Sequence, residues 1–349
     1  MLVYWLLFAF FASGALLRRG GTTRQPAPTA LLVGAVLIWM AIGLRYEVGA
    51  DWRTYKFLYS YAGLADLGRV LAIGDPGYQL VSWCVRQTGA EIWALNLICA
   101  LIFTWGLYRF VRAQPDPWLA FVVAMPYLIV VVAMGYTRQA VAIGILMGGL
   151  AALKRGASIA RFALYVAAAA LFHKTAVVVL PLVIFAGQRN KFLNALAGIA
   201  SCYLFYDLFL ADSVEGFVRN YIESEYSSQG AAIRVTMNLV PAVIFLLFRR
   251  RLRFDEGEAG VWQYFSLASL LMPVLLIVLA SSTAVDRLSL YLIPLQIAVL
   301  PRVSFLFKNH QAGRAVIVFY AMAVMFTWLN FAAHAQYWVP YKIYPGLLG

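Results

Sequence analysis

Apolar stretches separated by short polar loops recur along the whole of this chain of 349 residues. Most are about 16 to 22 residues long, enough for a helix to cross or nearly cross a lipid bilayer. The pattern predicts ten spans, at about 2–17, 29–44, 92–110, 118–134, 138–153, 192–210, 234–248, 262–281, 287–303 and 314–333. No polar stretch is long enough for a separate soluble domain, so we expect residues 1–349 to form a single integral membrane domain.

The composition agrees with this pattern. The chain is 63% hydrophobic and only 12% charged, with a mean hydropathy of +0.78. A soluble domain carries about 25% charged residues, so a chain this apolar needs lipid as its solvent. We therefore predict an all-α polytopic membrane protein. The first apolar stretch is not typical of a cleaved signal peptide, because Arg18, Arg19 and Arg24 follow it instead of preceding it.

The formal net charge of +13 is concentrated in short loops between the predicted spans. Lys and Arg in such loops mark the cytoplasmic side of a membrane protein, so nucleic acid is not an expected partner. The basic loops are 18–24, 109–112, 154–161, 188–191, 249–253 and 302–314. With all of them in the cytoplasm, the topology is N-out and C-out. The segments left outside are 45–91, 135–137, 211–233, 282–286 and the tail from His334.

Two of these basic loops, 154–161 and 188–191, are separated by only one apolar stretch, residues 162–187. If both loops are cytoplasmic, this stretch cannot cross the membrane once. We predict a re-entrant pair of short helices with His173 and its neighbours Lys174 and Thr175 near the bend. Non-helical backbone at that depth is tolerated only inside protein or beside a watery cavity.

The longest outer loop, 45–91, carries five basic and five acidic residues together with many aromatic ones. This balance predicts short amphipathic helices on the membrane surface. Asp51 suits the start of one such helix, from which Asp51, Tyr55 and Tyr59 share a face. A capping role alone would account for Asp51 and is worth about 1 kcal/mol.

Three arginines stand where helices that run inward from the outer side are expected to begin: Arg138, Arg234 and Arg287. A helix N-terminus already carries a partial positive charge, so a cation there is disfavoured by about 0.3–1 kcal/mol. Three on one side indicate a bound anion, and a diphosphate fits because guanidinium groups bind phosphate oxygens in a bidentate manner. The alternatives are interfacial snorkelling and pairing with a nearby acid, such as Asp286 for Arg287.

His173 is the only histidine inside an apolar stretch. A histidine in such a place is either a satisfied interior polar group or a functional one, acting as a base toward a hydroxyl or as a donor to phosphate. Asp51 and Glu47 are alternative bases if a dry cleft raises their pKa. Glu47 could equally pair with a nearby cation.

Aromatic residues make up 15% of the chain, and an aromatic belt at the membrane interfaces explains most of them. In the outer loops, however, Tyr and Trp are mixed with Asp, Glu, Gln and Arg, a mixture suited to sugars. The sequence has no Walker-type phosphate loop, no G-x-G-x-x-G after a strand and no D-x-D pair for a metal-bound nucleotide sugar. An enzyme of this kind is expected to take its activated substrate from the bilayer, without a metal and without a cofactor.

Seven short motifs occur in order along most of the chain: RYEVGADWRTY (45–55), DPGY (75–78), YTRQAVAIGI (136–145), ALFHKTAVVVLP (170–181), YSSQG (226–230), DRLSLYLIP (286–294) and YWVPY (337–341). Together they resemble the EpsG-type branch of the Wzy-like bacterial polysaccharide polymerases. The resemblance implies a membrane glycosyltransferase that moves a growing glycan from undecaprenyl diphosphate to the terminal sugar hydroxyl of another lipid-linked repeat unit. The reaction would take place at the periplasmic or outer face of the inner (cytoplasmic) membrane, in exopolysaccharide or capsule biosynthesis.

The resemblance places Arg45, Asp51, Arg138, His173 and Arg287 on characteristic positions of that family. Combined with the residue arguments, it assigns His173 and Asp51 to catalysis and assigns the diphosphate to Arg138, Arg287, Arg45 and Arg234. Sugar contacts are expected from Glu47, Tyr55, Tyr78, Gln139, Tyr226, Tyr337 and Trp338. The expected partners are the undecaprenyl-diphosphate-linked oligosaccharide and the bilayer, with a chain-length regulator and other polysaccharide-assembly proteins as further candidates.

Three other functions stay open at this stage. An O-antigen-ligase-like transferase would use the same donor with a different acceptor. A flippase would move the lipid-linked glycan across the membrane, and a membrane acyltransferase would use His173 to activate a hydroxyl. The chain has no internal repeat and most candidate charges lie at one rim, which favours an enzyme over a transporter.

Overall fold

The computed structural model describes residues 1–17, 28–187, 191–205, 230–278 and 282–345. Within these ranges the secondary structure is helical, apart from one isolated antiparallel bridge between Arg45 and Ile343. The all-α class is therefore confirmed for the described part of the chain. Tyr226, nearly all of the outer loop predicted at 211–233, and the basic loop at 18–24 lie outside these ranges.

Helices long and apolar enough to span a membrane are present, as a polytopic membrane protein requires. Among the described residues there are five: α6 (Ile92–Arg112), α13 (Ala231–Phe248), α14 (Glu256–Val278), Ser282–Leu306 and α17 (His310–Phe331). Further helices follow the other expected spans: α1 (Leu2–Leu16), α2 (Pro28–Gly43), α7 (Pro117–Ala124) with η1 (Met125–Ala133), α8 (Thr137–Lys154) and α11 (Lys191–Phe205). The count of ten spans and their orientation stay predictions.

One predicted span is built from several helical pieces. Residues 282–306 comprise α15 (Ser282–Ser289), η5 (Leu290–Leu292), α16 (Ile293–Val299) and η6 (Leu300–Leu306). The segment was expected to begin at Arg287, but α15 begins at Ser282 and Arg287 lies in its last turn. The expectation of a helix N-terminus at Arg287 is therefore wrong.

The described loops gather at two ends of the helical bundle, and contacts link distant segments within each end. At one end Arg302 donates to Gln114 Oε1 (2.7 Å) and Lys154 pairs with Glu258 (3.0 Å). At the other end the backbone N–H of Tyr46 donates to the carbonyl of Lys342 (2.9 Å). Segments beside the described basic loops near 112, 154 and 302 are thus linked at one end, and which end faces the cytoplasm stays a prediction.

Residues 159–187 fold back on themselves as a helical hairpin. The hairpin consists of α9 (Ile159–Ala170), the 3₁₀ turn η2 (Lys174–Val178) and α10 (Val179–Phe185). Its two ends meet, since Ile159, Val183 and Gly187 line one small cavity together with Lys154. The predicted break beside His173 is confirmed, because α9 ends just before it and η2 begins just after it.

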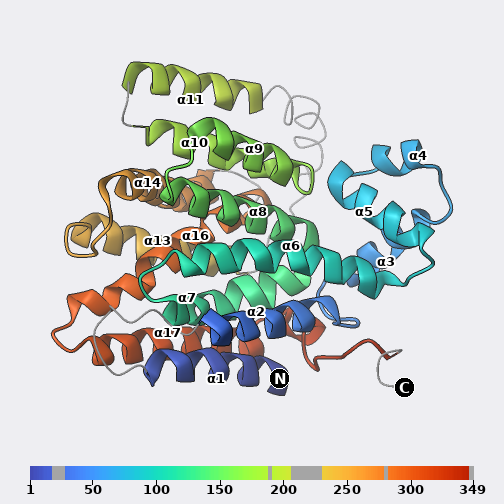
Figure 1. The fold of residues 1–349 in the computed structure, drawn as a ribbon, viewed down its shortest axis with the longest axis horizontal. Coiled ribbons are helices and arrows are strands. Elements are labelled where there is room, and N and C mark those ends of the chain that lie inside the picture. The colour runs from blue at the N-terminus through green and yellow to red at the C-terminus, as the bar shows by residue number, and fades with distance from the viewer. Residues whose placement is uncertain (18–27, 188–190, 206–229, 279–281, 346–349) are drawn as a thin grey trace.

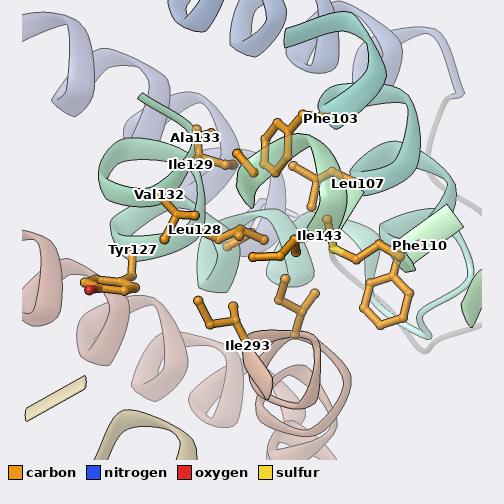
Figure 2. Close-up of a cluster of buried hydrophobic side chains, with 14 of the residues drawn as sticks. Phe103, Leu107, Phe110, Tyr127, Leu128, Ile129, Val132, Ala133, Ile143 and Ile293 are labelled. Atoms are coloured by element: carbon orange, nitrogen blue, oxygen red, sulfur yellow. The ribbon is translucent and has the colours of Figure 1, made fainter. Parts of the chain in front are cut away.

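The core is centred on α7 and η1, whose residues are almost all buried. Pro126, which has no backbone N–H, stands at the start of the π-helical segment η1. Figure 2 shows the side chains packed here, from α6, η1, α8 and α16: Phe103, Leu107, Phe110, Tyr127, Leu128, Ile129, Val132, Ala133, Ile143 and Ile293. Only three residues separate the end of η1 from the start of α8, so the buried position of η1 limits where α8 can start.

The helices α6 and α8 cross at two glycines. A Cβ atom on Gly106 would lie only 1.8 Å from the carbonyl oxygen of Gly144. Small residues at a crossing let two helix backbones approach closely, which membrane proteins use for packing. Any side chain at Gly106 would push α8 away from α6.

Three short helices form a separate layer at one end of the bundle: α3 (Trp52–Tyr61), α4 (Leu67–Ala72) and α5 (Pro76–Gln87). We call it the outer layer, because its residues belong to the loop expected outside. Figure 1 shows them beyond the ends of the long helices. The expectation of short helices within 45–91 is therefore confirmed. Asp66 caps α4 by accepting from the backbone N–H of Arg69 (3.1 Å), whereas Asp51 and Asp75, at the same position of α3 and α5, make no such capping bond.

Candidate active site: a basic cavity at the hairpin bend

A cavity of about 850 Å³ lies between the outer layer and the hairpin. Its polar lining includes Asp75, Arg138, His173, Lys174 and Arg287. These residues come from the starts of α5 and α8, from the hairpin bend and from α15. Two of the four arginines expected to bind the diphosphate, Arg138 and Arg287, thus face one shared space although they are distant in sequence.

Arg138, near the start of α8, is held by an acid from the outer layer. Its Nη1 atom donates to Oδ2 of Asp75 at 2.8 Å, and its side chain is 31% exposed. The other oxygen of Asp75 accepts from the backbone N–H of Lys174 at 3.4 Å. Burial raises the pKa of the Asp75 carboxyl group, and the charge of Arg138 opposes that shift. Asp75 therefore joins α5, α8 and the hairpin bend.

Arg287 is exposed at the cavity wall. Its backbone carbonyl accepts a hydrogen bond from Nε2 of Gln139, the residue after Arg138 (2.7 Å). The neighbouring Asp286, considered above as a partner for Arg287, instead binds Arg234. Through Gln139 the backbone of α15 is fixed to α8, which holds Arg287 close to Arg138.

Asp51 occupies the N-cap position of α3, but its side chain makes no capping hydrogen bond. The charges that act on it most strongly are those of Arg287 and Arg138. Burial raises the pKa of the Asp51 carboxyl group, and the two arginines lessen the rise. Asp51 therefore does not act as a hydrogen-bonding helix cap in this structure, and its role in the site stays a prediction.

His173 stands at the hairpin bend in an extended conformation. Its Nδ1 atom lies 2.8 Å from Oγ1 of Thr175, and Thr175 donates to the hydroxyl of Tyr291 at 3.1 Å. The His173 ring also packs edge-on against the buried ring of Tyr291, with centroids 6.3 Å apart. Thr175 and Tyr291 thus fix the position of the imidazole that lines the cavity.

Tyr55 and Tyr78, expected to contact sugar, lie under the cavity wall. Both are buried, with ring centroids 5.6 Å apart. The Tyr55 hydroxyl accepts a long hydrogen bond (3.5 Å) from the backbone N–H of Arg138. Gln139 is buried as well. These three side chains support the site from behind, next to Arg138.

Arg45, expected to bind the diphosphate, is only 1% exposed and does not line the cavity. Its guanidinium donates to the carbonyl of Ile42 (2.5 Å) and to Oγ1 of Thr137 (2.7 Å). Thr137 immediately precedes Arg138, so Arg45 fixes the start of α8. Its observed contacts are therefore structural.

Arg234, the other arginine expected at the diphosphate, also lies outside the cavity lining. It makes a bidentate ion pair with Asp286, at 2.5 Å from Nε to Oδ1 and 2.7 Å from Nη2 to Oδ2. The helix α13 begins at Ala231, so Arg234 stands in its first turn and not at its first residue. The pair clamps α13 to α15, the helix that carries Arg287.

Three further candidates for sugar contact lie apart from the cavity. Glu47 is exposed and pairs with Lys342 at 2.9 Å, the cation pairing considered above. Tyr337 is 46% exposed, and its backbone carbonyl accepts from the N–H of Gly49. Trp338 is buried at 1% exposure, with its indole N–H donating to the carbonyl of Val130 (2.8 Å), so its side chain belongs to the core.

Sequence reasoning missed Asp75, Thr175 and Tyr291 as site residues. Asp75 opens the motif DPGY, in which Pro76 starts a helix and an acid before it is ordinarily a cap. In the structure Asp75 makes no capping bond and instead pairs with Arg138 at 2.8 Å. Thr175 and Tyr291 are 116 residues apart, and their contact has no local signal in the sequence.

The fold and the site together define a multi-pass helical membrane protein with a basic cavity at one end of its bundle. The chain belongs to the EpsG family, whose profile matches residues 29–343, nearly the whole length. Membership of this family identifies the chain as a membrane polymerase of polysaccharide biosynthesis. Comparison with curated proteins and with solved structures found no match.

Proposed function

We propose that the protein polymerises lipid-linked repeat units. The donor is a growing glycan on undecaprenyl diphosphate, and the acceptor is the terminal sugar hydroxyl of a second lipid-linked repeat unit. The reaction takes place at the outer, periplasmic face of the inner membrane, in exopolysaccharide or capsule biosynthesis. One observation carries the proposal: Arg138, Arg287 and His173 line the same cavity.

The arginines stabilise the leaving group. As the bond between the anomeric carbon and the diphosphate oxygen breaks, its electron pair remains on the diphosphate. Guanidinium groups bind phosphate oxygens with two donors each, and preorganised donors of this kind stabilise charge that develops in the transition state. Arg138 and Arg287 are the two cavity arginines in position to act in this way, so the step needs no metal ion.

His173 accepts the proton of the acceptor hydroxyl. In this proposal Thr175 donates its single hydroxyl hydrogen to Tyr291, and its Oγ1, 2.8 Å from Nδ1, accepts from the Nδ1–H tautomer of His173. That tautomer leaves the lone pair on Nε2 free. The acceptor oxygen forms the new bond to the anomeric carbon while its proton passes to Nε2.

Asp51 acts beside this chemistry in our proposal. The positive charges of Arg287 and Arg138 both act on its carboxylate. We propose that this carboxylate orients the two arginines and the acceptor hydroxyl. Tyr55, Tyr78 and Gln139 hold the wall behind the sugars. Arg45 and Arg234 keep the starts of α8 and α13 in place and do not contact substrate.

The test is polymer assembly in cells that carry Arg138→Ala or Arg287→Ala at wild-type protein levels, with Arg161→Ala as the matched control. Arg161 is exposed on α9 and lies outside the cavity lining. Loss of one transition-state donor typically costs about 100-fold or more in rate, so each cavity variant is expected to lose polymer. Full-length polymer in both variants would overturn the proposal.

Product analysis of a deletion strain separates the proposal from its rivals. A polymerase leaves single lipid-linked repeat units on the outer leaflet. A flippase leaves them on the cytoplasmic leaflet, a ligase leaves polymer without its final acceptor, and an acyltransferase leaves chain length unchanged. The first of these outcomes supports the proposal, and each of the others removes it.

A further inference from the structure

The basic cavity has two chemically different walls. Its charged side chains gather at the hairpin bend and the start of α8. Away from the bend, α9 contributes Ala163, Val166, Ala167 and Ala170 to the lining, and their spacing places them on one face of the helix. The hairpin adds Leu171, Val177 and Leu180 near the bend, whereas Ala72, Ile73 and Pro76 line the cavity from the opposite side. We call the four α9 residues together with Leu171, Val177 and Leu180 the apolar wall.

The apolar wall extends away from the charged end along α9. Ala170 lies three residues before His173, and Ala163 lies seven residues further back along the helix. At a rise of 1.5 Å per residue, these four residues cover about 10 Å. The side chains of this face of α9 carry no hydrogen-bonding group, so the wall offers nothing to a sugar hydroxyl.

We propose that the apolar wall binds the first isoprenoid units of the lipid carrier, while the carrier's diphosphate lies between Arg138 and Arg287. This inference rests on the proposed function and assigns a lipid subsite to the same cavity. A ligand that fits must join a strong anion directly to a flexible apolar chain. A prenyl diphosphate has this composition, and its chain leaves the phosphates in a single strand.

The charge of the cavity supports this occupant over the sugar end of the substrate. Arg138, Lys174 and Arg287 outnumber Asp75 at the polar end, so an anion is held there. The chain bonded to that anion must then leave the charged end, and the apolar wall begins at Leu171, two residues before His173. The glycan leaves on the opposite side of the phosphates, toward the outer layer and Asp51.

The experiment measures direct binding of sugar-free prenyl diphosphates of increasing length to the full chain in lipid nanodiscs. The series has one, two, three and eleven isoprenoid units. Each buried methylene improves affinity roughly fourfold, so affinity is expected to rise steeply over the first two or so units and then to level off. The length at which it levels off reports the length of the apolar wall.

Two variants on the same helix locate the effect. Ala167→Trp fills the middle of the apolar wall and is expected to abolish most of the gain with chain length, with at least a tenfold loss for the longer diphosphates and little change for the shortest. Leu164→Trp is the matched control, because Leu164 is 71% exposed and does not line the cavity. It is expected to bind the whole series like the unmodified chain.

Three results would overturn the inference. Affinity independent of chain length would show that only the phosphates bind. An equal loss for all lengths in Ala167→Trp would show that the tryptophan acts on the phosphate site. Displacement of the long diphosphate by a bilayer phospholipid, with no preference for prenyl chains, would assign the wall to ordinary lipid. Binding is measured without catalysis. A chain that binds the series as expected but makes no polymer would therefore support the lipid subsite and contradict the proposed polymerase function.

Discussion

The Nη1 atom of Arg138 lies 2.8 Å from Oδ2 of Asp75, so an acid of the outer layer neutralises one of the two arginines that face the cavity. A diphosphate that binds Arg138 must share this guanidinium with Asp75 or displace it. Asp75 also accepts from the N–H of Lys174, so the same carboxylate holds the hairpin bend. Asp75 therefore competes with a bound anion for Arg138 and at the same time holds Arg138 and the hairpin bend in position.

Asp75→Asn is expected to separate these two roles. The amide keeps the shape of the side chain but removes its negative charge. Inorganic diphosphate should then inhibit several-fold more strongly, while turnover falls about tenfold because a neutral side chain holds Arg138 and the bend less firmly. Inhibition constants and polymer yield in purified membranes give both numbers. Asp66→Asn is the control, since Asp66 pairs with Arg69 on an exposed surface; weaker inhibition of Asp75→Asn by diphosphate would contradict the expectation.

Thr175→Val is expected to remove the group that orients His173. The methyl group that replaces the hydroxyl cannot accept from Nδ1, so the imidazole loses its fixed tautomer. General base catalysis contributes about 100- to 10,000-fold, so a drop of about 10- to 100-fold in kcat with a small change in KM is expected. Thr175→Ser keeps the hydroxyl and should restore most of the rate. Equal activity of the Val and Ser variants would show that the hydroxyl plays no part.

Asp51→Asn is expected to lower activity and to raise stability. Burial raises the pKa of Asp51 in the folded chain, so protonation favours folding, and the stability it brings is lost as the pH rises through that raised pKa. At neutral pH the neutral amide therefore avoids the cost of a buried charge. Thermal unfolding in detergent should show a higher Tm for Asp51→Asn at pH 7 than for the unmodified chain, with the difference shrinking at low pH.

The Asp51 carboxyl group is also expected to determine how activity falls at acid pH, the acid limb of the pH–activity profile. Since the carboxylate is the form that orients the arginines, activity should fall as the pH drops through the raised pKa, above the usual value of about 3.9 for an aspartic acid. The limb should be weaker or absent in Asp51→Asn. An unchanged limb in this variant would assign it to another group, with Asp75 the next to test because burial raises its pKa as well.

Arg234→Ala is expected to act on folding, in contrast to the cavity arginines. Its removal leaves Asp286, which is 8% exposed, without its bidentate partner. Breaking a buried ion pair on one side costs about 3–5 kcal/mol, and the low end is expected here because the pair is partly exposed. Protein level and Tm should drop, and the double variant Arg234→Ala with Asp286→Ala should recover part of the loss. If the Arg234→Ala chain is fully stable but makes no polymer, Arg234 has a role in substrate binding and the expectation is wrong.

Much of the architecture could be predicted from the sequence because lipid imposes a simple rule on it. Apolar length located most helices, for example α6 at Ile92–Arg112 against an expected span of about 92–110. Two basic loops expected on the same side are separated by one apolar stretch, which predicted a break near His173. Local helix propensity alone would not show this break. The short helices of the outer loop followed from its balanced charge and its aromatic content.

The site was harder to predict, because its geometry depends on contacts between distant segments. Position in the sequence could not separate Arg138 and Arg287, which line the cavity, from Arg45 and Arg234, which do not. The difference lies in their neighbours: Thr137 and Ile42 receive the Arg45 side chain, and Asp286 receives that of Arg234. The helix-dipole argument for Arg287 failed because α15 begins five residues earlier, at Ser282.

The residues around Asp51 are braced by a stretch of chain made much later. Tyr46 and Leu44 pair with Lys342 and Tyr344 through their backbones, and Gly49 donates to the carbonyl of Tyr337, roughly 290 residues away. During translation the segment 44–51 therefore lacks these partners until residues 337–344 have left the ribosome. A nascent chain halted after α17 would hold every helix of the bundle and still lack the support that sets Asp51 beside its arginines.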